Sequence, residues 1–505
     1  MGRSIATALT MGNLHSYGGS LIPHRMSPTE LPLAAARWLF LANIVLAAWM
    51  YGGTREWSKT TVAWLLLANT GLFAAGLLAK VRLPRVPLPA ALAVAFLLIQ
   101  GWLMTWNAQR RFIENARVFV DRIQPLPGWP GFADTGLVLP TLLLSTGLLG
   151  GFCIACDLAR NPIWRDRLWT TLAATGVSLA ILGLAQRLTE APSIFWDLDR
   201  NLGNTFFAVF RYHANAGAFI NLVLPLLTGL ALRAWLSEGH ETKRVIWTLA
   251  ALLTAASGFV NVSRAANVIC ALLILGMGFS TGWLKIRRSG RRGPLPKIIF
   301  ALAAVALATA ALAFSFGIEK TLHRWDVSYW SSTPQEDGRY QAYEIIVRSA
   351  LPAAGVCGFG PGTFEAMFDI HRFKSGSRLA GRWDKAHSDA LQTPMEWGLA
   401  GAAAWLLILG GAFVRAICQA AKRGAMETRL LSAACAFSLG GVILHALVDF
   451  PLQIASLQLF SLAIAGLAWG MTANSASRSR KNKLARLPHE DKVGESIAGR
   501  TSVPQ

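Results

Sequence analysis

Residues 245–284 read VIWTLAALLTAASGFVNVSRAANVICALLILGMGFSTGWL, an apolar stretch of about 40 residues. As one helix rising 1.5 Å per residue it would measure about 60 Å, roughly twice the hydrocarbon thickness of a bilayer. The polar residues inside it cluster near its middle and are Asn261, Ser263, Arg264 and Asn267. We therefore expect two membrane-spanning helices that turn back at this cluster.

The composition of the whole chain is that of a membrane protein. Of its 505 residues, 53% are hydrophobic and 15% are charged, too few polar groups to cover a soluble surface. The six cysteines lack the spacing of a disulfide-rich scaffold or a zinc ribbon. The net charge of +21 would favour nucleic acid in a soluble protein, but here the basic residues lie mostly between apolar runs and set topology. We expect a lipid bilayer around the chain and no nucleic-acid partner.

Apolar runs long enough to cross the bilayer recur about twelve times. The predicted spans are Arg37–Tyr51, Thr61–Ala79, Pro89–Trp106, Gly136–Leu158, Thr170–Arg187, Ala216–Leu236, Val245–Val262, Ala265–Leu284, Ile298–Ile318, Leu399–Ile417, Leu430–Val448 and Gln453–Met471. The predicted fold is therefore an all-α polytopic membrane protein with about twelve transmembrane helices.

Lysine and arginine in the short breaks between spans predict the direction of the chain. Breaks at 80–85, 160–167, 285–297 and 422–429 and the tail at 478–492 are basic and belong in the cytoplasm. Alternation then places both termini in the cytoplasm, with the breaks at 52–59, 107–135, 188–215, 261–267 and 319–396 outside. The predicted parts are a cytoplasmic N-terminus (1–36), helices 1–9 (37–318), a large outside loop (319–396), helices 10–12 (397–471) and a disordered cytoplasmic tail (472–505).

The large outside loop is the segment where a functional site is expected, because loops of this length are usually functional. Its run Gly358-Phe359-Gly360-Pro361-Gly362 follows no predicted strand and contains a proline, so we interpret it as a tight turn rather than a nucleotide-binding loop. Asp197-Leu198-Asp199 resembles a metal motif of nucleotide-sugar transferases but has no soluble α/β domain around it. We expect neither a metal nor another cofactor.

Four polar side chains on the outside face are candidates for a site: Arg211, Arg264, Arg339 and His387. An arginine near a membrane surface is costly to desolvate unless an anion meets it, and its planar guanidinium suits phosphate oxygens. We expect Arg264 and Arg211, with Arg339 as a third contact, to bind a lipid-linked phosphate. Alternatively, Arg211 and Arg339 contact only headgroups or loop carboxylates.

An outside histidine near arginines fits a general base, because imidazole titrates near neutral pH and accepts a proton from a hydroxyl. Four histidines meet this description, and composition does not choose among them: His213, His323, His371 and His387.

Two acidic residues follow His387 closely in the sequence, and a third stands on the predicted eleventh helix. Asp389 and Glu396 could orient a base, or could satisfy neighbouring backbone groups or cap the tenth helix. Asp449 follows His445 by four residues, so the two share a helix face, and we expect a structural pair there.

Six short motifs follow one another along the second half of the chain. They are the aromatic-basic stretch 210–217 with Leu224-Pro225-Leu226, the Ser263–Ala266 turn, the glycine run 358–364, the stretch 386–392 around His387, the motif 396–401, and 445–452. Together they resemble the O-antigen ligase and polymerase superfamily, the membrane proteins of the Wzy and ligase type. Ser388 stands where that family usually has asparagine.

The resemblance implies a helical glycosyltransferase of the C type in the bacterial inner membrane. It would transfer glycan from an undecaprenyl-diphosphate carrier to an acceptor hydroxyl at the periplasmic face, with His387 as the matching histidine and no nucleotide or metal. The acceptor could be glycan, lipid or protein, so O-antigen or exopolysaccharide polymerase, ligase and protein O-glycosyltransferase all stay open. A polysaccharide or lipid-linked-sugar transporter is the alternative from another class, disfavoured by the nearly uncharged midplane positions.

Overall fold

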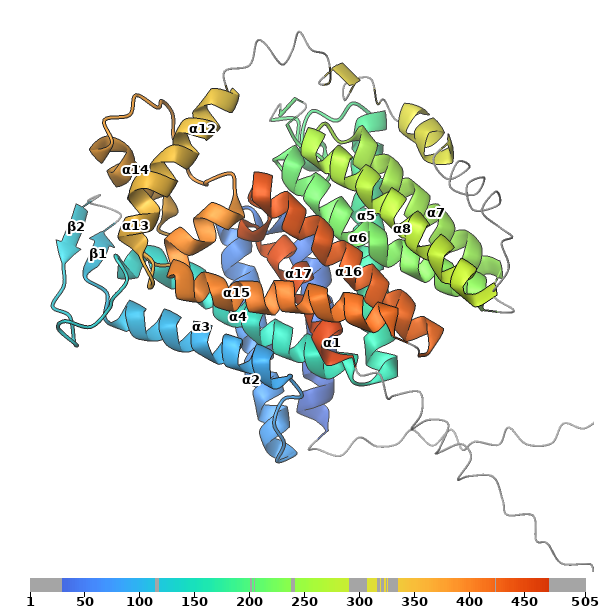
Figure 1. Cartoon of the computed structure of the whole chain (residues 1–505), viewed down its shortest axis with the longest axis horizontal. Coiled ribbons are helices and arrows are strands. Elements are labelled where there is room, and N and C mark those ends of the chain that lie inside the picture. The colour runs from blue at the N-terminus through green and yellow to red at the C-terminus, as the bar shows by residue number, and fades with distance from the viewer. Residues whose placement is uncertain are drawn as a thin grey trace, which may run out of the picture.

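The computed structural model describes residues 30–113, 118–199, 202–203, 205–237, 241–289, 307–315, 318, 322–323, 325, 335–422 and 424–471. The predicted cytoplasmic tail, nearly all of the N-terminal segment and most of the predicted ninth span therefore lie outside the described residues. Figure 1 shows long helices packed side by side, with a group of shorter elements beyond one end of α15.

The described elements follow one another as a series of helices interrupted by one hairpin of strands. In chain order they are α1 (Leu31–Trp49), α2 (Glu56–Ala79), α3 (Leu88–Trp106), β1 (Arg110–Ile113), β2 (Val118–Asp121), α4 (Thr135–Ala159), α5 (Pro162–Leu188), α6 (His213–Leu236), α7 (Glu241–Val260), α8 (Arg264–Ser289), α12 (Gln335–Ile345), α13 (Leu351–Ala354), α14 (Phe364–Lys374), α15 (Asp389–Ala421), α16 (Met426–Val448) and α17 (Ala455–Gly470).

Nine helices of the described part of the chain are long and apolar enough to cross a membrane. They are α1 to α7, α15 and α16, and shorter apolar helices cover Arg264–Ser280, within α8, and Ala455–Gly470. A mostly helical chain with this many apolar helices is consistent with the predicted polytopic membrane protein.

The hairpin expected within residues 245–284 is confirmed. Helix α7 ends at Val260 and α8 begins at Arg264, so the turn falls in the predicted polar cluster. The side chain of Asn261 in this turn donates a hydrogen bond of 2.8 Å to the carbonyl of His213, the first residue of α6. The turn is therefore fixed against the first residue of the neighbouring helix α6.

Helix α15 contains a break at Gly398, where φ is +69°, so its second part begins at Leu399, the predicted start of the tenth span. The helical segment before the break falls in the predicted outside loop. Its polar residues, among them Asp389 and Glu396, suggest a surface loop, yet the fold buries both. The polar side chains are hydrogen-bonded inside the protein instead of reaching water.

A two-stranded hairpin is a further departure from the all-α prediction. Strands β1 and β2 pair antiparallel, with Arg110 opposite Asp121 and Phe112 opposite Phe119. The Arg110 Nε to Asp121 Oδ1 distance is 3.1 Å. The predicted break at 107–135 therefore contains a small sheet. Its strands are too short to be predicted from apolar runs of membrane-spanning length.

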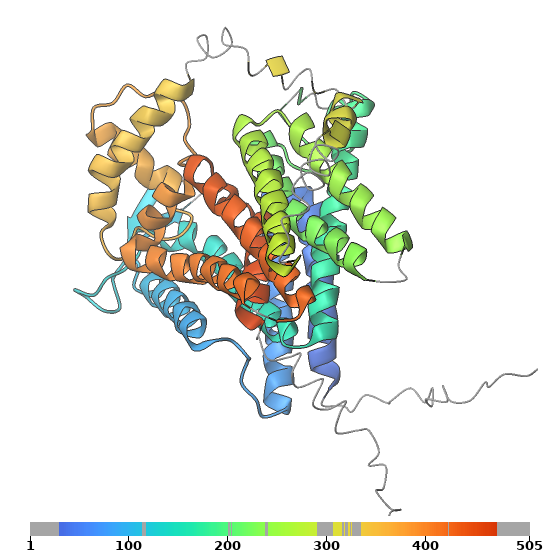
Figure 2. The ribbon, with the colours of Figure 1, turned by 45° about the vertical axis from the view of Figure 1, so that its right-hand side comes forward.

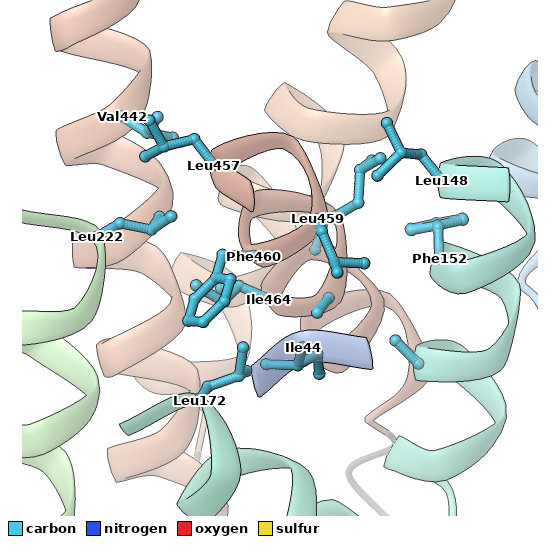
Figure 3. Close-up of a cluster of buried hydrophobic side chains, with 14 of the residues drawn as sticks. Ile44, Leu148, Phe152, Leu172, Leu222, Val442, Leu457, Leu459, Phe460 and Ile464 are labelled. Carbon is cyan, nitrogen blue, oxygen red and sulfur yellow. The ribbon is translucent and has the colours of Figure 1, made fainter. Parts of the chain in front are cut away.

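Helix α17 lies at the centre of the bundle. It has only 16 residues, and it is buried on every side because other helices surround it. In Figure 3 its side chains Leu457, Leu459, Phe460 and Ile464 extend outward among residues of the surrounding helices. Helix α4 approaches it most closely, because a Cβ placed on Gly466 would lie 2.4 Å from the Cβ of Ala155. This core holds the ends of α15, α16 and α17 in fixed relative positions.

The glycine run of the outside loop packs against the break in α15. The amide of Gly360 donates to the carbonyl of Glu396 at 2.8 Å, and the amide of Leu399 donates to the carbonyl of Gly355 at 3.2 Å. Gly358, Gly360 and Gly362 all have positive φ. These contacts confirm a turn that glycine alone fits, and they give the run a structural role.

We expect Gly358→Ala to lower the free energy of unfolding by about 2 to 5 kcal/mol, from the strain of positive φ together with overpacking. The added Cβ would lie 2.3 Å from the amide nitrogen of Gly398. Gly376→Ala is the control, because its φ is also positive but nothing lies within 4 Å of its Cβ. Unfolding by SDS in mixed micelles measures the free energy of unfolding of both variants. Equal losses of stability in Gly358→Ala and Gly376→Ala would contradict the packing role of Gly358.

The predicted direction of the chain can be tested at the two ends of α15. Arg378, before the helix, and Gly424, after it, are both exposed. In a chain whose exposed Cys418 is replaced by serine, Arg378→Cys should react with an impermeant maleimide on intact cells. Gly424→Cys should react only after the membrane is opened, and the reverse pattern would show that the direction is wrong.

Candidate functional site

His387 lies just before α15 in a backbone conformation that is unusual for a residue other than glycine. Its φ is +53°. The hydroxyl of Tyr343 donates to the His387 carbonyl at 2.7 Å, and the amide of Asp389 donates to the carbonyl of Asp449 at 3.1 Å. Because such strain persists only where surrounding contacts impose it, and often at functional sites, the conformation marks His387 for closer analysis.

The imidazole of His387 lies between an acidic and a basic side chain. Its Nδ1 is 3.4 Å from Asp449 Oδ1 and also 3.4 Å from Arg339 Nη2. A proton on Nδ1 would be donated to the carboxylate, since the guanidinium has no acceptor to offer. In that tautomer Nε2 carries the lone pair and can accept a proton from a substrate.

Aromatic rings surround this imidazole. Phe450 and Trp383 meet it edge to face at centroid distances of 5.0 and 5.9 Å. Tyr212 stacks on Phe450 with centroids 5.6 Å apart and an angle of 1° between the rings. The His387 side chain keeps 25% of its surface exposed, so it is enclosed but still accessible to a substrate.

The charges around His387 favour a protonated arginine and neutral phenols. Burial lowers the pKa of Arg339, but Tyr212 and Asp449 outweigh it and raise the pKa above its usual value. Burial, and then the charge of Asp449, raises the pKa of Tyr212 to about 12. Burial also raises the pKa of Tyr343. The site therefore presents one cation and two hydroxyl groups beside the imidazole.

The structure brings Arg339 and His387 together, as the sequence predicted for a shared site. The Arg339 Nη2 atom also lies 3.4 Å from the hydroxyl of Tyr212, which connects it to the start of α6. Arg339 is thus held between the outside loop and the membrane helices. The contacts described for Arg339 are all with other residues of the protein, so the binding of phosphate by Arg339 stays a prediction.

The two carboxylates singled out from the sequence hold the backbone rather than the imidazole. Asp389 accepts hydrogen bonds from the amide of Leu452 at 2.8 Å and from Gln453 Nε2 at 3.0 Å. Glu396 accepts from Gln392 Nε2 at 3.0 Å and from the backbone of the glycine run. Both residues fix the start of α15, which was the structural alternative for each.

Asp449 is the carboxylate that faces His387, and the sequence analysis assigned it elsewhere. The expected structural pair of His445 and Asp449 is wrong: both ring nitrogens of His445 lack a hydrogen-bond partner in the described part of the chain. The carboxylate of Asp449 instead accepts a hydrogen bond of 3.0 Å from the amide of Phe450 and lies beside His387. Helix α16 ends at Val448, which frees Asp449 from the helix face that the spacing argument assumed.

The remaining predicted residues lie on elements next to this cluster. Arg211 is exposed and precedes Tyr212 directly, and His213, whose ring centroid is 4.9 Å from that of Tyr212, begins α6. Arg264 is half-buried at the first residue of α8, in the turn that Asn261 fixes to His213. The two arginines therefore lie on adjoining segments, Arg211 just before α6 and Arg264 at the start of α8.

His371, another histidine of the large loop, has a structural role within the loop. His371 is buried and its Nδ1 lies 2.8 Å from the hydroxyl of Ser349. Burial, and then Lys374, lowers its pKa, so the neutral form is favoured. This neutral, hydrogen-bonded imidazole pins α14 to the segment that follows α12.

A metal centre finds no support in the described residues, where no three His, Cys, Asp or Glu side chains gather to bind an ion. The Asp197 carboxylate of the Asp-x-Asp stretch accepts the amide of Asp199 at 3.2 Å, an ordinary local turn.

The cluster of His387, Asp449, Arg339 and Tyr212 can therefore do one kind of chemistry well. An imidazole oriented by a carboxylate can remove a proton, while a neighbouring guanidinium stabilises negative charge. Neither the protein-family models nor the curated proteins contain a match to this chain, so the geometry of this cluster and the motifs of the sequence carry its interpretation.

Proposed function

We propose that this protein is a metal-independent membrane glycosyltransferase that moves glycan from an undecaprenyl-diphosphate-linked donor to an acceptor hydroxyl at the periplasmic membrane face. The observation that carries the proposal is the placement of His387 between Asp449 and Arg339, beside the starts of α6 and α15. O-antigen or exopolysaccharide polymerisation or ligation is the setting in which such a reaction occurs.

In the proposed reaction the acceptor hydroxyl attacks the anomeric carbon of the donor glycan. The bond from that carbon to the diphosphate oxygen breaks, and the lipid diphosphate leaves with the electron pair. His387 Nε2 takes the proton of the acceptor hydroxyl, and the carboxylate of Asp449 stabilises the imidazolium that forms. The proton balance closes when the imidazolium releases its proton to water.

Negative charge develops on the leaving diphosphate, and the arginines of the site are suited to meet it. Arg339 is closest to His387 and stays protonated, since its pKa is raised. Arg211 and Arg264 lie on adjoining segments at the starts of α6 and α8. We assign the diphosphate to this set of three arginines.

The proposal is tested with purified protein in proteoliposomes that contain an undecaprenyl-diphosphate-linked oligosaccharide. With acceptor present, the expected products are an extended or transferred glycan and free undecaprenyl diphosphate in equal amounts, without added nucleotide or metal and in the presence of a chelator. Movement of the intact donor across the bilayer without cleavage would overturn the proposal in favour of a transporter.

A further inference from the structure

A groove runs along the second half of α15, at the end of the helix remote from His387. Its volume is about 1000 Å³, at the upper end of the roughly 300–1000 Å³ typical of small-ligand pockets. Leu406, Leu407, Gly410 and Val414 form its apolar wall, with Ile443 of α16 and Trp469 of α17 beside them. In Figure 2 this half of α15 (orange) lies beside α16 (red), at the end of α15 that points away from α12 (yellow).

The apolar wall has the length of one leaflet. From Leu406 to Arg415 an α-helix rises about 14 Å, close to half of the roughly 30 Å hydrocarbon core. Leu406 and Val414 are 67% and 58% exposed, so this wall faces the space that lipid occupies around an apolar helix. Gly410 leaves the wall hollow at its middle. The shape fits an acyl chain lying along the helix.

The groove ends at a group of positive charges. Arg415 and Lys422 line it, and Arg429 Nε lies 3.0 Å from the carbonyl of Ala420 at the end of α15. Arg415 is fixed there, because its Nε and Nη2 donate to the carbonyls of Ala468 and Met471 at 3.2 and 3.1 Å. The guanidinium therefore stays at the end of the groove.

Carboxylates nearby do not neutralise these charges in the described part of the chain. Asp157 is bound by Arg37 and Arg82, and Glu427 is bound by Arg233. Arg160 directly follows α4, whose last residue, Ala159, adjoins Gly470 next to Met471, the residue to which Arg415 donates. The Nε of Arg160 is buried without a hydrogen-bond partner among the described residues. An anion at this position would meet several unneutralised cations.

We infer that this groove binds an anionic phospholipid, with one acyl chain along α15 and the headgroup phosphate at Arg415 and Lys422. A neutral lipid would fill the apolar wall equally well but would leave the cations unmatched, whereas basic pockets between membrane helices select anionic headgroups. The inference does not depend on the proposed glycan transfer.

Native mass spectrometry of delipidated protein tests the inference, by titration with dioleoylphosphatidylglycerol and, separately, with dioleoylphosphatidylcholine. The wild type should bind the first phosphatidylglycerol at least about fivefold more tightly, the preference expected for one basic group near the headgroup. Lys422→Gln should reduce this preference about fivefold. Gly410→Phe, which fills the hollow in the groove, should abolish the preference for phosphatidylglycerol.

Two variants elsewhere in the chain serve as matched controls. Gly71→Phe places the same ring on an open surface of α2, where nothing lies within 4 Å of the Cβ, and Arg85→Gln removes an exposed charge elsewhere. Both should keep the wild-type preference. Equal affinity of the wild type for the two lipids would overturn the inference. So would displacement of phosphatidylglycerol by undecaprenyl phosphate at a lower concentration, which would assign the groove to a polyprenyl chain.

Discussion

Replacement of His387 by alanine should reduce the rate of glycan transfer by about 10² to 10⁴, the usual contribution of a general base. The imidazole is the group whose Nε2 would take the acceptor proton while its Nδ1 faces Asp449. Binding of the lipid-linked donor should persist, because the arginines remain. Part of the lost rate should return as pH rises, since the acceptor hydroxyl then needs less help to lose its proton. Initial rates in proteoliposomes at several pH values measure these effects.

A second substitution separates catalysis from folding. Alanine is strained at the φ of +53° that His387 adopts, so His387→Ala also risks poor expression. Asparagine tolerates this conformation but accepts no proton, so His387→Asn should fold and still lose transfer. His371→Gln, in the same loop but bonded to Ser349, should lose stability and keep its rate per folded molecule. Wild-type transfer by a folded His387→Asn protein would reject the role.

Asp449→Asn should lower the rate of transfer by about 10² to 10⁴ with little change in shape, because an amide no longer favours the tautomer with a proton on Nδ1. The carboxylate is buried, 4% exposed, and its Oδ1 faces His387. The double variant with His387→Asn should be hardly slower than either single variant, since both remove the same function. Rates of all three proteins measure this coupling.

Asp389→Asn provides the control for this substitution. Asp389 is as buried as Asp449, and its amide donates to the Asp449 carbonyl. Its carboxylate oxygens, however, accept hydrogen bonds from Leu452 and Gln453 rather than from the imidazole. Its replacement should lower thermal stability more than the rate per folded molecule. If Asp449→Asn behaves in the same way, Asp449 is structural and the imidazole acts without it.

Hydropathy predicted the apolar helices and the hairpin at Asn261, because both depend on the free energy of placing local sequence in a bilayer. It gave no sign of the helical segment before the break in α15, where Asp389 and Glu396 are polar and yet buried. Apart from Gln392, the donors to these carboxylates include Gln453 and the glycine run, which are far away in sequence. A local pattern cannot show partners of this kind, so polar buried segments are read as loops.

The candidate site was predicted only in part, because its members also come together from distant parts of the sequence. Arg339 was a candidate because a charged residue near apolar spans is conspicuous in the sequence, whereas His387 was chosen among four histidines only by the motif 386–392. Asp449 was wrongly paired with His445, because the i, i+4 rule applies only inside a helix and α16 ends at Val448. The motif 445–452 did carry a signal, since it places an acidic residue at the end of an apolar span.

The backbone contact between Asp389 and Asp449 joins the start of α15 to the segment after α16. His387 therefore leaves the ribosome well before the residue that orients it, and the two meet only once the following helix is in place. A nascent chain or a fragment that ends within α16 has the imidazole but not the carboxylate beside it. The proposed activity would therefore depend on completion of α16, so that a half-made molecule would not act on the proposed lipid-linked substrate.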